Sequence, residues 1–251
     1  MLHVPVLLEE SLDFLLHNLS GSYLDLTFGR GSHSQEILKR LSPDGTLDAV
    51  DRDKDAVLYG KEHFNDSRFS IHHSNYSEIE LLFSNKQFDG IILDLGICST
   101  HLDDPNRGFS FQTNGPLDMR MNANDDNVPL AKEILNEYPK EDLEKIFREY
   151  GEERFSSRIA DSIVSTRGSK PFLRTKDLEE VIFHCYPKKL RFKGAHPATR
   201  CFQALRIFIN RELDVLRETL PKLMPLLSSG GRIAIISFHS LEDRIVKLGF
   251  K

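Results

Sequence analysis

The sequence predicts an α/β fold in which a mostly parallel β-sheet is covered by helices and interrupted by a helical insertion. First, short apolar segments alternate with helix-like segments near both ends of the chain, which is typical of βαβ units. Second, the apolar run Gly90–Asp94 ends in an acid and indicates a buried strand. Third, apolar residues recur at helical spacing from Leu130 to about Phe183, between the two α/β regions.

The first α/β region contains four strand candidates. These are Tyr23–Leu26, Leu47–Asp51, Phe69–His72 and Gly90–Asp94. Helical spacing of Ile37, Leu38 and Leu41 indicates a helix after the first strand. Ser77 and Glu80 have the spacing of a capping box, which predicts that a helix begins there.

The rest of the chain changes character twice. Residues 98–128 are rich in Asp, Asn, Gly and Pro, which indicates a long ordered or functional loop. A helical stretch follows, with Thr175 as the expected N-cap of one helix. Phe202–Leu227 predicts one more long helix, and Arg232–Phe238 a second strong strand. We therefore expect a discontinuous core, residues 1–104 and 202–251, and an insertion of loop plus helices, residues 105–201.

Composition limits the class of protein. A net charge of −5 argues against a protein that coats nucleic acid through bulk charge, although it allows a local basic surface. The sequence has no apolar run of the roughly 20 residues needed to cross a bilayer, and its start lacks the basic region of a signal peptide. The three cysteines lack zinc-ligand spacing and fit reduced thiols. We expect a cytoplasmic protein without membrane or metal.

A glycine-containing loop follows the first strand. The segment from Asp25 to Gly31 places Gly29 and Gly31 at a strand-to-helix turn, where glycine lets the backbone approach a ligand. Asp51 ends the next strand about 20 residues on, where a carboxylate accepts both hydroxyls of a ribose.

Three interpretations of this loop stay open on spacing alone. It is an ordinary turn, a dinucleotide site, or a site for S-adenosylmethionine. A dinucleotide site favours a third glycine where Ser34 stands, which counts against NAD. An acid at Asp25 suits a cationic methionyl group better than a pyrophosphate.

Seven segments in order carry a more specific signal. They are Phe28–Ser34, Asp94–Asp103, Arg107–Phe111, Gly115–Met121, Tyr150–Phe155, His196–Arg200 and Ser237–Arg244. Together they resemble the bacterial 16S rRNA (cytosine N4)-methyltransferase family, over about His3 to Lys247. The resemblance implies a class I methyltransferase core (Rossmann-like), with a helical insertion that helps to recognise substrate. It also implies N4 methylation of a cytidine in the decoding centre of the small ribosomal subunit.

The resemblance further implies the residues that bind the methyl donor, S-adenosylmethionine. Carried over position by position, they are Gly31, Ser32, His33, Asp51, Tyr76, Asp94 and His101. The family usually has glycine where Ser32 stands, and we expect serine to be tolerated if its φ is negative. It often has Ser-Pro-Gln near Cys98–His101, and His101 can still donate a hydrogen bond.

The family also continues beyond Lys247 with further strands and a basic tail, whereas this chain stops at Lys251. Arg232–Ser237 is therefore expected near an exposed sheet edge. One alternative on this basis is an RNA-binding member with reduced or lost activity. Another is a NAD-dependent oxidoreductase.

The expected chemistry is displacement of a methyl group by a cytosine N4 whose lone pair is delocalised. Asp94, or the backbone of Leu95–Ile97, is the expected acceptor near that nitrogen, while a role of Asp94 in donor binding alone is equally open. A thiolate attack by Cys98 is the less favoured alternative, because the Pro-Cys context of C5 methylation is missing.

RNA contacts are expected in the insertion. Phe109 is a candidate for stacking on an extruded cytosine, with anchoring of its loop as the alternative. A short basic stretch is a candidate for phosphate contacts, with a solvated surface as the alternative. The expected substrate-binding residues are Phe109, Arg120, Lys188, Lys189, Arg191, Lys193 and Arg200. The expected partner is 16S rRNA within the 30S subunit, and the chain is compatible with a homodimer.

Overall fold

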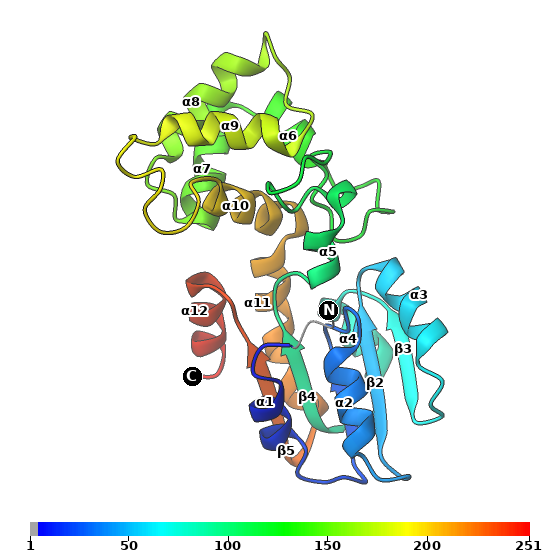
Figure 1. The fold of residues 1–251 in the computed structure, drawn as a ribbon. Coiled ribbons are helices and arrows are strands. Elements are labelled where there is room, and N and C mark those ends of the chain that lie inside the picture. Colours follow the sequence, from blue (N-terminus) through cyan, green and yellow to red (C-terminus); the bar gives the residue numbers. More distant parts are fainter. Residues whose placement is uncertain (1–4) are drawn as a thin grey trace. The chain divides into compact units, whose positions relative to one another are not determined.

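The computed structural model describes residues 5–251, apart from the side chain of Ser99. The first four residues, on which the expected lack of a signal peptide partly depends, lie outside this range. The described chain forms two compact units (Figure 1). The first combines the N-terminal part up to Cys98 with Glu212–Lys251, and the second is Ser99–Arg211. Their boundaries differ by a few residues from the domain boundaries expected from sequence, and the roles of those domains stay a prediction.

The first unit is built on a five-stranded parallel sheet of order β3-β2-β1-β4-β5. Its strands are β1 (Ser22–Asp25), β2 (Thr46–Asp51), β3 (Phe69–His73), β4 (Phe88–Asp94) and β5 (Leu227–Ile236). The parallel α/β class predicted from sequence is therefore confirmed. β5 lies at an edge of the described sheet, as expected for that segment.

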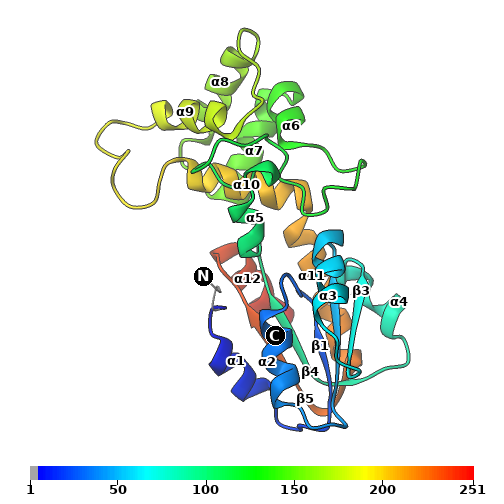
Figure 2. The ribbon, with the colours of Figure 1, turned by 45° about the vertical axis from the view of Figure 1, so that its right-hand side comes forward.

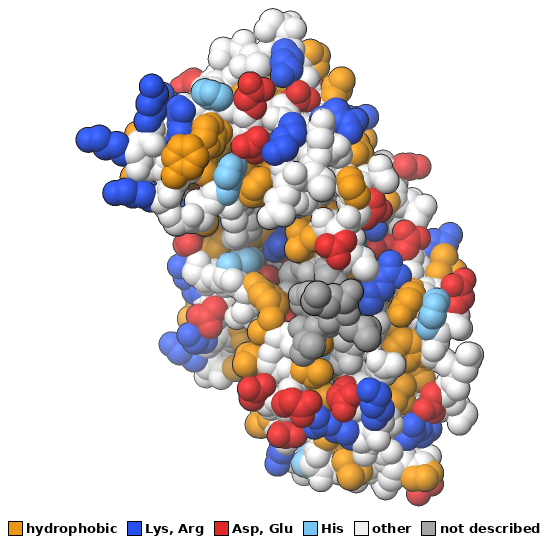
Figure 3. All heavy atoms as spheres, in the orientation of Figure 1, with side chains coloured by type: hydrophobic (Ala, Val, Ile, Leu, Met, Phe, Trp, Pro, Cys, Tyr) orange, Lys and Arg blue, Asp and Glu red, His pale blue; other side chains and the backbone are white. Residues whose placement is uncertain are grey.

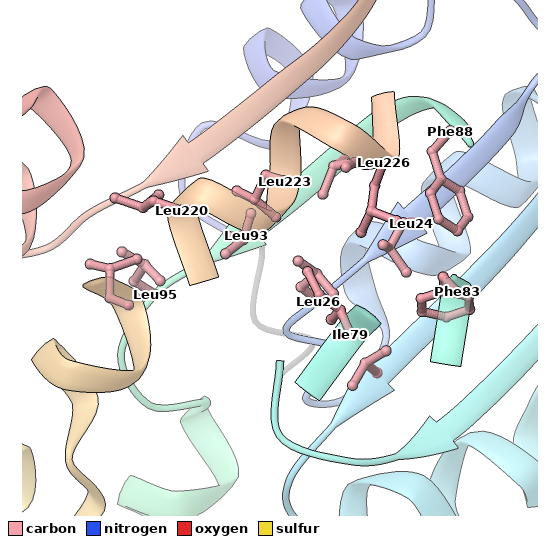
Figure 4. Close-up of a cluster of buried hydrophobic side chains, with 13 residues drawn as sticks. Leu24, Leu26, Ile79, Phe83, Phe88, Leu93, Leu95, Leu220, Leu223 and Leu226 are labelled. Atoms are coloured by element: carbon pink, nitrogen blue, oxygen red, sulfur yellow. The ribbon is translucent and has the colours of Figure 1, made fainter. Parts of the chain in front are cut away.

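Alternate residues of the central strands face two different cores, because successive side chains of a strand point to opposite faces. Leu24 and Leu93 pack against Leu220 and Leu223 on one face (Figure 4). Tyr23 belongs to the core on the other face. Helices cover both faces, as a parallel sheet requires. They are α1 (Leu8–Leu15), α2 (Ser32–Arg40), α3 (Lys54–His63), η1 (Tyr76–Glu78), α4 (Ile79–Phe83), α11 (Glu212–Leu223), η3 (Met224–Leu226) and α12 (Ser240–Gly249).

The second unit is helical (Figure 2). Its helices are α5 (Ser99–Asp103), η2 (Pro105–Arg107), α6 (Ala131–Glu137), α7 (Lys140–Gly151), α8 (Ser156–Arg167), α9 (Thr175–Cys185) and α10 (Ala198–Asn210). The helical spacing predicted from sequence is confirmed in α7, where Leu143, Ile146 and Phe147 are buried on one face. The insertion therefore has its own apolar core.

Three local expectations are wrong, and a fourth is confirmed only in part. The single helix expected over Phe202–Leu227 is two helices, because Arg211 adopts a left-handed conformation with φ 51° and ends α10. The stretch expected as an ordered or functional loop, residues 98–128, begins with the short helices α5 and η2 and, within the described chain, contains no other helix or strand, so this expectation is confirmed in part. Asn75, not Ser77, caps η1 by accepting the Ser77 N–H. Thr175 is the first residue of α9 rather than its cap, and its hydroxyl donates to the Thr113 carbonyl.

Candidate active site

The candidate site lies at the carboxyl ends of β1, β2 and β4. β1 and β4 are neighbours, but the chain proceeds from them to opposite edges of the sheet. Such a switch point is where open α/β sheets bind ligands. Each of these three strands ends in a carboxylate: Asp25, Asp51 and Asp94.

The loop after β1 has the conformation that its glycines predict. Gly29 and Gly31 have φ of 56° and 73°, and Gly31 is the N-cap of α2. A Cβ on Gly31 would come within 2.7 Å of the Phe28 ring and would also meet the Phe64 ring. The space that a side chain at this position would need is therefore filled by these two rings. Glycine is therefore needed here for packing as well as for its φ. Ser32 is the first residue of α2 and is absent from the residues with positive φ, so serine is tolerated as expected.

Asp51 is held in place by backbone groups. The Gly29 N–H donates to Asp51 Oδ2 at 2.7 Å, and the Asp53 N–H donates to Oδ1 at 2.8 Å. The carboxylate that ends β2 is thus fixed against the glycine loop.

Asp25 and Thr27 join β1 to β4. Asp25 is buried, accepts hydrogen bonds from the Ser34 hydroxyl at 2.7 Å and the Thr27 N–H at 3.1 Å, and has a pKa raised by burial to about 6. The Thr27 hydroxyl oxygen accepts the Asp94 N–H at 2.7 Å. Ser34, which stands where a dinucleotide site favours glycine, thus has a structural partner in this site.

Asp94 and His33 face each other at the centre of the site. His33 Nδ1 lies 3.8 Å from Asp94 Oδ2, and burial lowers the pKa of His33 to about 4. Burial first, and then the charges of Asp25 and Glu242, raise the pKa of Asp94 to about 7. Asp94 Oδ1 and His33 Nε2 are buried without a hydrogen-bond partner among the described residues. A buried acceptor that lacks a donor in the protein calls for a partner such as a water molecule, an ion or a ligand group.

Two residues of this site were missed by the sequence analysis. Glu242, in the first turn of α12, is only 2% exposed, accepts the Phe238 N–H at 2.9 Å, and lies 3.2 Å from His239 Nε2. Phe238 follows β5, is 55% exposed, and lies 3.7 Å from where a Cβ of Gly96 would be. Both belong to the segment Ser237–Arg244, which contributed to the family resemblance but was given no role.

Tyr76 and Cys98 also belong to the first unit. Burial raises the pKa of Tyr76, and the charges of Glu212 and Glu242 add to this effect, so its hydroxyl stays protonated at neutral pH. Cys98 is half-buried, with its Cβ 3.3 Å from the position of a Cβ on Gly29.

Phe109 and Arg120, which were expected to bind the substrate, both contact other residues of the second unit. Phe109 is only 6% exposed and stacks on His101 with ring centroids 5.2 Å apart, so the structure favours its anchoring role over stacking on a base. Arg120 donates to Asp118 at 2.9 Å and to the Asp125 carbonyl at 2.9 Å, and therefore organises its own loop.

Most residues of the expected basic cluster lie in the loop between α9 and α10, and Arg200 lies on α10. Lys188, Lys189 and Lys193 are exposed. Arg191 donates to the carbonyls of Tyr186 and His184, and Arg200 donates to that of Glu152.

In the described part of the chain, no group of His, Cys, Asp or Glu has the arrangement of a metal site, and no helix has the length and apolar character of a membrane span.

This sheet order, with a glycine loop after β1 and acids ending β2 and β4, defines a Rossmann-like α/β protein of the class I methyltransferase type. The chain matches the model of the MraW methylase family over residues 1–251 and belongs to that family.

Curated relatives agree with the family. The chain is 48% identical to the "Ribosomal RNA small subunit methyltransferase H" of Pseudoalteromonas atlantica, over 98% of this chain and 79% of the relative. It is also 48% identical to the protein of the same name from Coxiella burnetii, over 98% and 80%. Among solved structures, a SAM-dependent methyltransferase from Aquifex aeolicus aligns over 57% of this chain and 77% of its own, with 16% identity and a TM-score of 0.32.

Proposed function

We propose that this protein transfers a methyl group from S-adenosylmethionine to the exocyclic N4 of a cytidine in 16S rRNA. Membership of a methylase family and relatives named as ribosomal RNA small subunit methyltransferases support the reaction class and the substrate. The N4 position and the decoding centre rest on the seven sequence segments that resemble the cytosine N4 enzymes. The observation that carries the proposal is the cluster of buried carboxylates around the unpaired Asp94 Oδ1.

The residues of the site fit this donor. S-adenosylmethionine carries its transferable methyl group on a positively charged sulfonium. The charges of Asp25 and Glu242 are close enough to Asp94 to raise its pKa, so this group of carboxylates favours a cation. Asp51, oriented by Gly29, would accept the ribose hydroxyls.

The remaining proposed donor contacts come from the resemblance. They are Gly31, Ser32, His33, Tyr76 and His101. His33 is neutral at pH 7 because burial lowers its pKa, so its unpaired Nε2 serves as a hydrogen-bonding group rather than as a second cation. His101 belongs to the second unit.

Asp94 also has the properties of the group that assists the nucleophile. The lone pair of cytosine N4 is delocalised into the ring, and an acceptor for an N4 hydrogen localises it. A carboxylate with a pKa of about 7 exchanges a proton at neutral pH, as general base catalysis requires. The backbone carbonyls of Leu95–Ile97 are the alternative acceptors. An Asp94→Asn variant that loses donor affinity but keeps kcat at saturating donor would assign Asp94 to binding alone.

The second unit would recognise the RNA. Its exposed lysines at 188, 189 and 193 offer phosphate contacts, while Arg191 and Arg200 support the same surface from their hydrogen-bonded positions. The natural substrate would be 16S rRNA within the 30S subunit, in the cytoplasm. The protein would act as a monomer or as a homodimer.

The test is incubation of the protein with undermethylated 30S subunits and labelled S-adenosylmethionine, followed by nucleoside analysis of the 16S rRNA. We expect label in N4-methylcytidine, and a large loss of label with Asp51→Asn. Label in another nucleoside would refute the proposed target. Binding of 30S subunits without any transfer would refute the enzyme and favour an RNA-binding protein.

A further inference from the structure

A row of five aromatic rings crosses the second unit. It starts in the core with Phe202 and Phe111, whose centroids are 5.1 Å apart, and continues to His196, stacked on Phe111 at 4.7 Å. His196 faces Phe183 at 5.9 Å with nearly parallel planes, and Phe183 meets Phe192 at 5.7 Å. The row therefore leads from the packed core to the loop between α9 and α10.

The outer end of this row is exposed. Phe192 is 85% exposed, the highest value among the exposed large hydrophobic residues of the described chain. One exposed apolar side chain is common on a protein surface, so a binding role for Phe192 depends on the groups around it.

The loop around Phe192 is held in shape. The Arg191 guanidinium lies 4.9 Å from the centroid of the Phe183 ring, and it donates hydrogen bonds to the carbonyls of Tyr186 and His184. His196, which also stacks on Phe183, lies 3.2 Å from a Glu179 oxygen. The inner rings are thus fixed by polar contacts as well as by packing.

Positive charge surrounds the exposed ring. Lys188, Lys189 and Lys193 are exposed and have no ion-pair partner among the described residues. Figure 3 shows blue side chains gathered around an orange one over the loop between α9 and α10. An aromatic face flanked by free lysines is the combination that binds an unpaired nucleotide, with the base on the ring and the phosphates on the cations.

We propose that Phe192, supported by Phe183 and Arg191, stacks on an unpaired base of the RNA substrate while the three lysines hold the adjoining phosphates. This inference rests on the proposed function in one respect, that the substrate is RNA. A duplex keeps its base faces stacked on one another, so the platform selects a single-stranded or looped segment. A protein surface is less favoured as the occupant, because the free charges of this loop are all positive and suit a phosphate backbone.

The test uses the full chain with four single-residue variants and one variant in which Lys188, Lys189 and Lys193 are all replaced by glutamine. Phe192→Ala removes the ring, Phe192→Leu keeps apolar area without a π-face, and Phe192→Trp keeps the π-face. Leu173→Ala is the matched control, since Leu173 is another exposed apolar residue of the same unit. Affinity is measured for a single-stranded oligoribonucleotide, its duplex, naked 16S rRNA and 30S subunits.

We expect Phe192→Ala and Phe192→Leu to weaken single-strand binding by about tenfold, the scale of one base–aromatic stack. Duplex binding should stay unchanged, and Phe192→Trp and Leu173→Ala should bind like the unaltered protein. Replacing the three lysines with glutamine should weaken binding to both RNAs and lower the slope of the salt dependence by about one for each phosphate that a lysine no longer binds.

Equal affinity of Phe192→Ala and the unaltered protein for single strands would overturn the platform, and so would restoration by leucine. Weaker binding to 30S subunits with unchanged binding to naked rRNA would also overturn it, because the occupant would then be a protein. Formation of N4-methylcytidine, tested separately, decides the proposed function whichever way this experiment turns out.

Discussion

Replacing Asp94 by asparagine should make the unliganded protein more stable at neutral and alkaline pH. The folded protein keeps this carboxyl protonated up to a pKa of about 7, against an ordinary value of 3.8, because burial and the charges of Asp25 and Glu242 disfavour its ionised form. A raised carboxyl pKa means that this group contributes less and less stability as pH rises from about 4 to about 7. An asparagine side chain does not ionise, so its contribution to stability does not change with pH over this range.

The size of the effect follows from the pKa. One pKa unit corresponds to about 1.4 kcal/mol, and the folded protein is half ionised at Asp94 at pH 7, so between pH 5 and pH 7 this ionisation reduces the free energy of unfolding by about 2 kcal/mol. The side chain is 26% exposed, and water entering the site reduces this figure. We therefore expect the gain of Asp94→Asn over the unaltered protein to be about 1–3 kcal/mol larger at pH 8 than at pH 5.

Urea unfolding of both proteins at pH 5 and pH 8, without ligand, measures this difference. Asp25, whose pKa is raised to about 6, titrates in the same direction and is present in both proteins, so the comparison reports Asp94 together with its charge coupling to Asp25. Asp44→Asn, in an exposed turn, is the matched control and should change little at either pH. A gain that is the same at pH 5 and pH 8 would show that Asp94 is not destabilised by ionisation.

Three further predictions test other parts of the site. Asp51→Asn should weaken S-adenosylmethionine binding by about 10–100-fold, the scale of lost hydrogen bonds to a charged group, in a calorimetric titration, and undiminished affinity would exclude a ribose contact. Gly31→Ala should lower the free energy of unfolding more than Gly194→Ala, because both glycines have positive φ but only Gly31 faces rings at 2.7 Å. Equal losses in the two variants would mean that only the cost of the positive φ, about 1–2 kcal/mol, acts at Gly31 and that the ring contacts add nothing. Phe109→Ala should destabilise the protein by about 3–5 kcal/mol in urea unfolding, and a folded variant of unchanged stability that has lost only RNA affinity would restore the stacking role.

Much of the fold was predictable because its determinants are local. The run Gly90–Asp94 had to be a buried strand, and the acids that end three strands had to meet at one edge of a parallel sheet. The break between α10 and α11 was not predictable in this way. Arg211 carries no glycine signal, and its left-handed conformation accompanies Asn210 side-chain bonds to Met119 and Met121, far away in sequence.

The site was predictable in part. The positions of Asp51 and Asp94 followed from strand ends, whereas the influence of Glu242 on the Asp94 pKa depends on a helix that follows the last strand of the sheet. Phe109 shows a property of a site residue that its local sequence could not reveal, the burial of its ring. Its neighbours suggested an exposed loop, but the contact with His101 that buries it depends on the fold of α5, which the Asp- and Gly-rich sequence concealed.

The central claim is that buried carboxylates at the carboxyl ends of the strands hold a cationic methyl donor. Calorimetric titration with S-adenosylmethionine and S-adenosylhomocysteine, at pH 6 and pH 8, tests it most directly, because the two ligands differ by the sulfonium charge. With a pKa of about 7, Asp94 is roughly 10% ionised at pH 6 and roughly 90% at pH 8. The preference for S-adenosylmethionine should therefore rise by up to about tenfold between these pH values and stay flat in Asp94→Asn. No binding of S-adenosylmethionine, or the same rise in the variant, would contradict the claim.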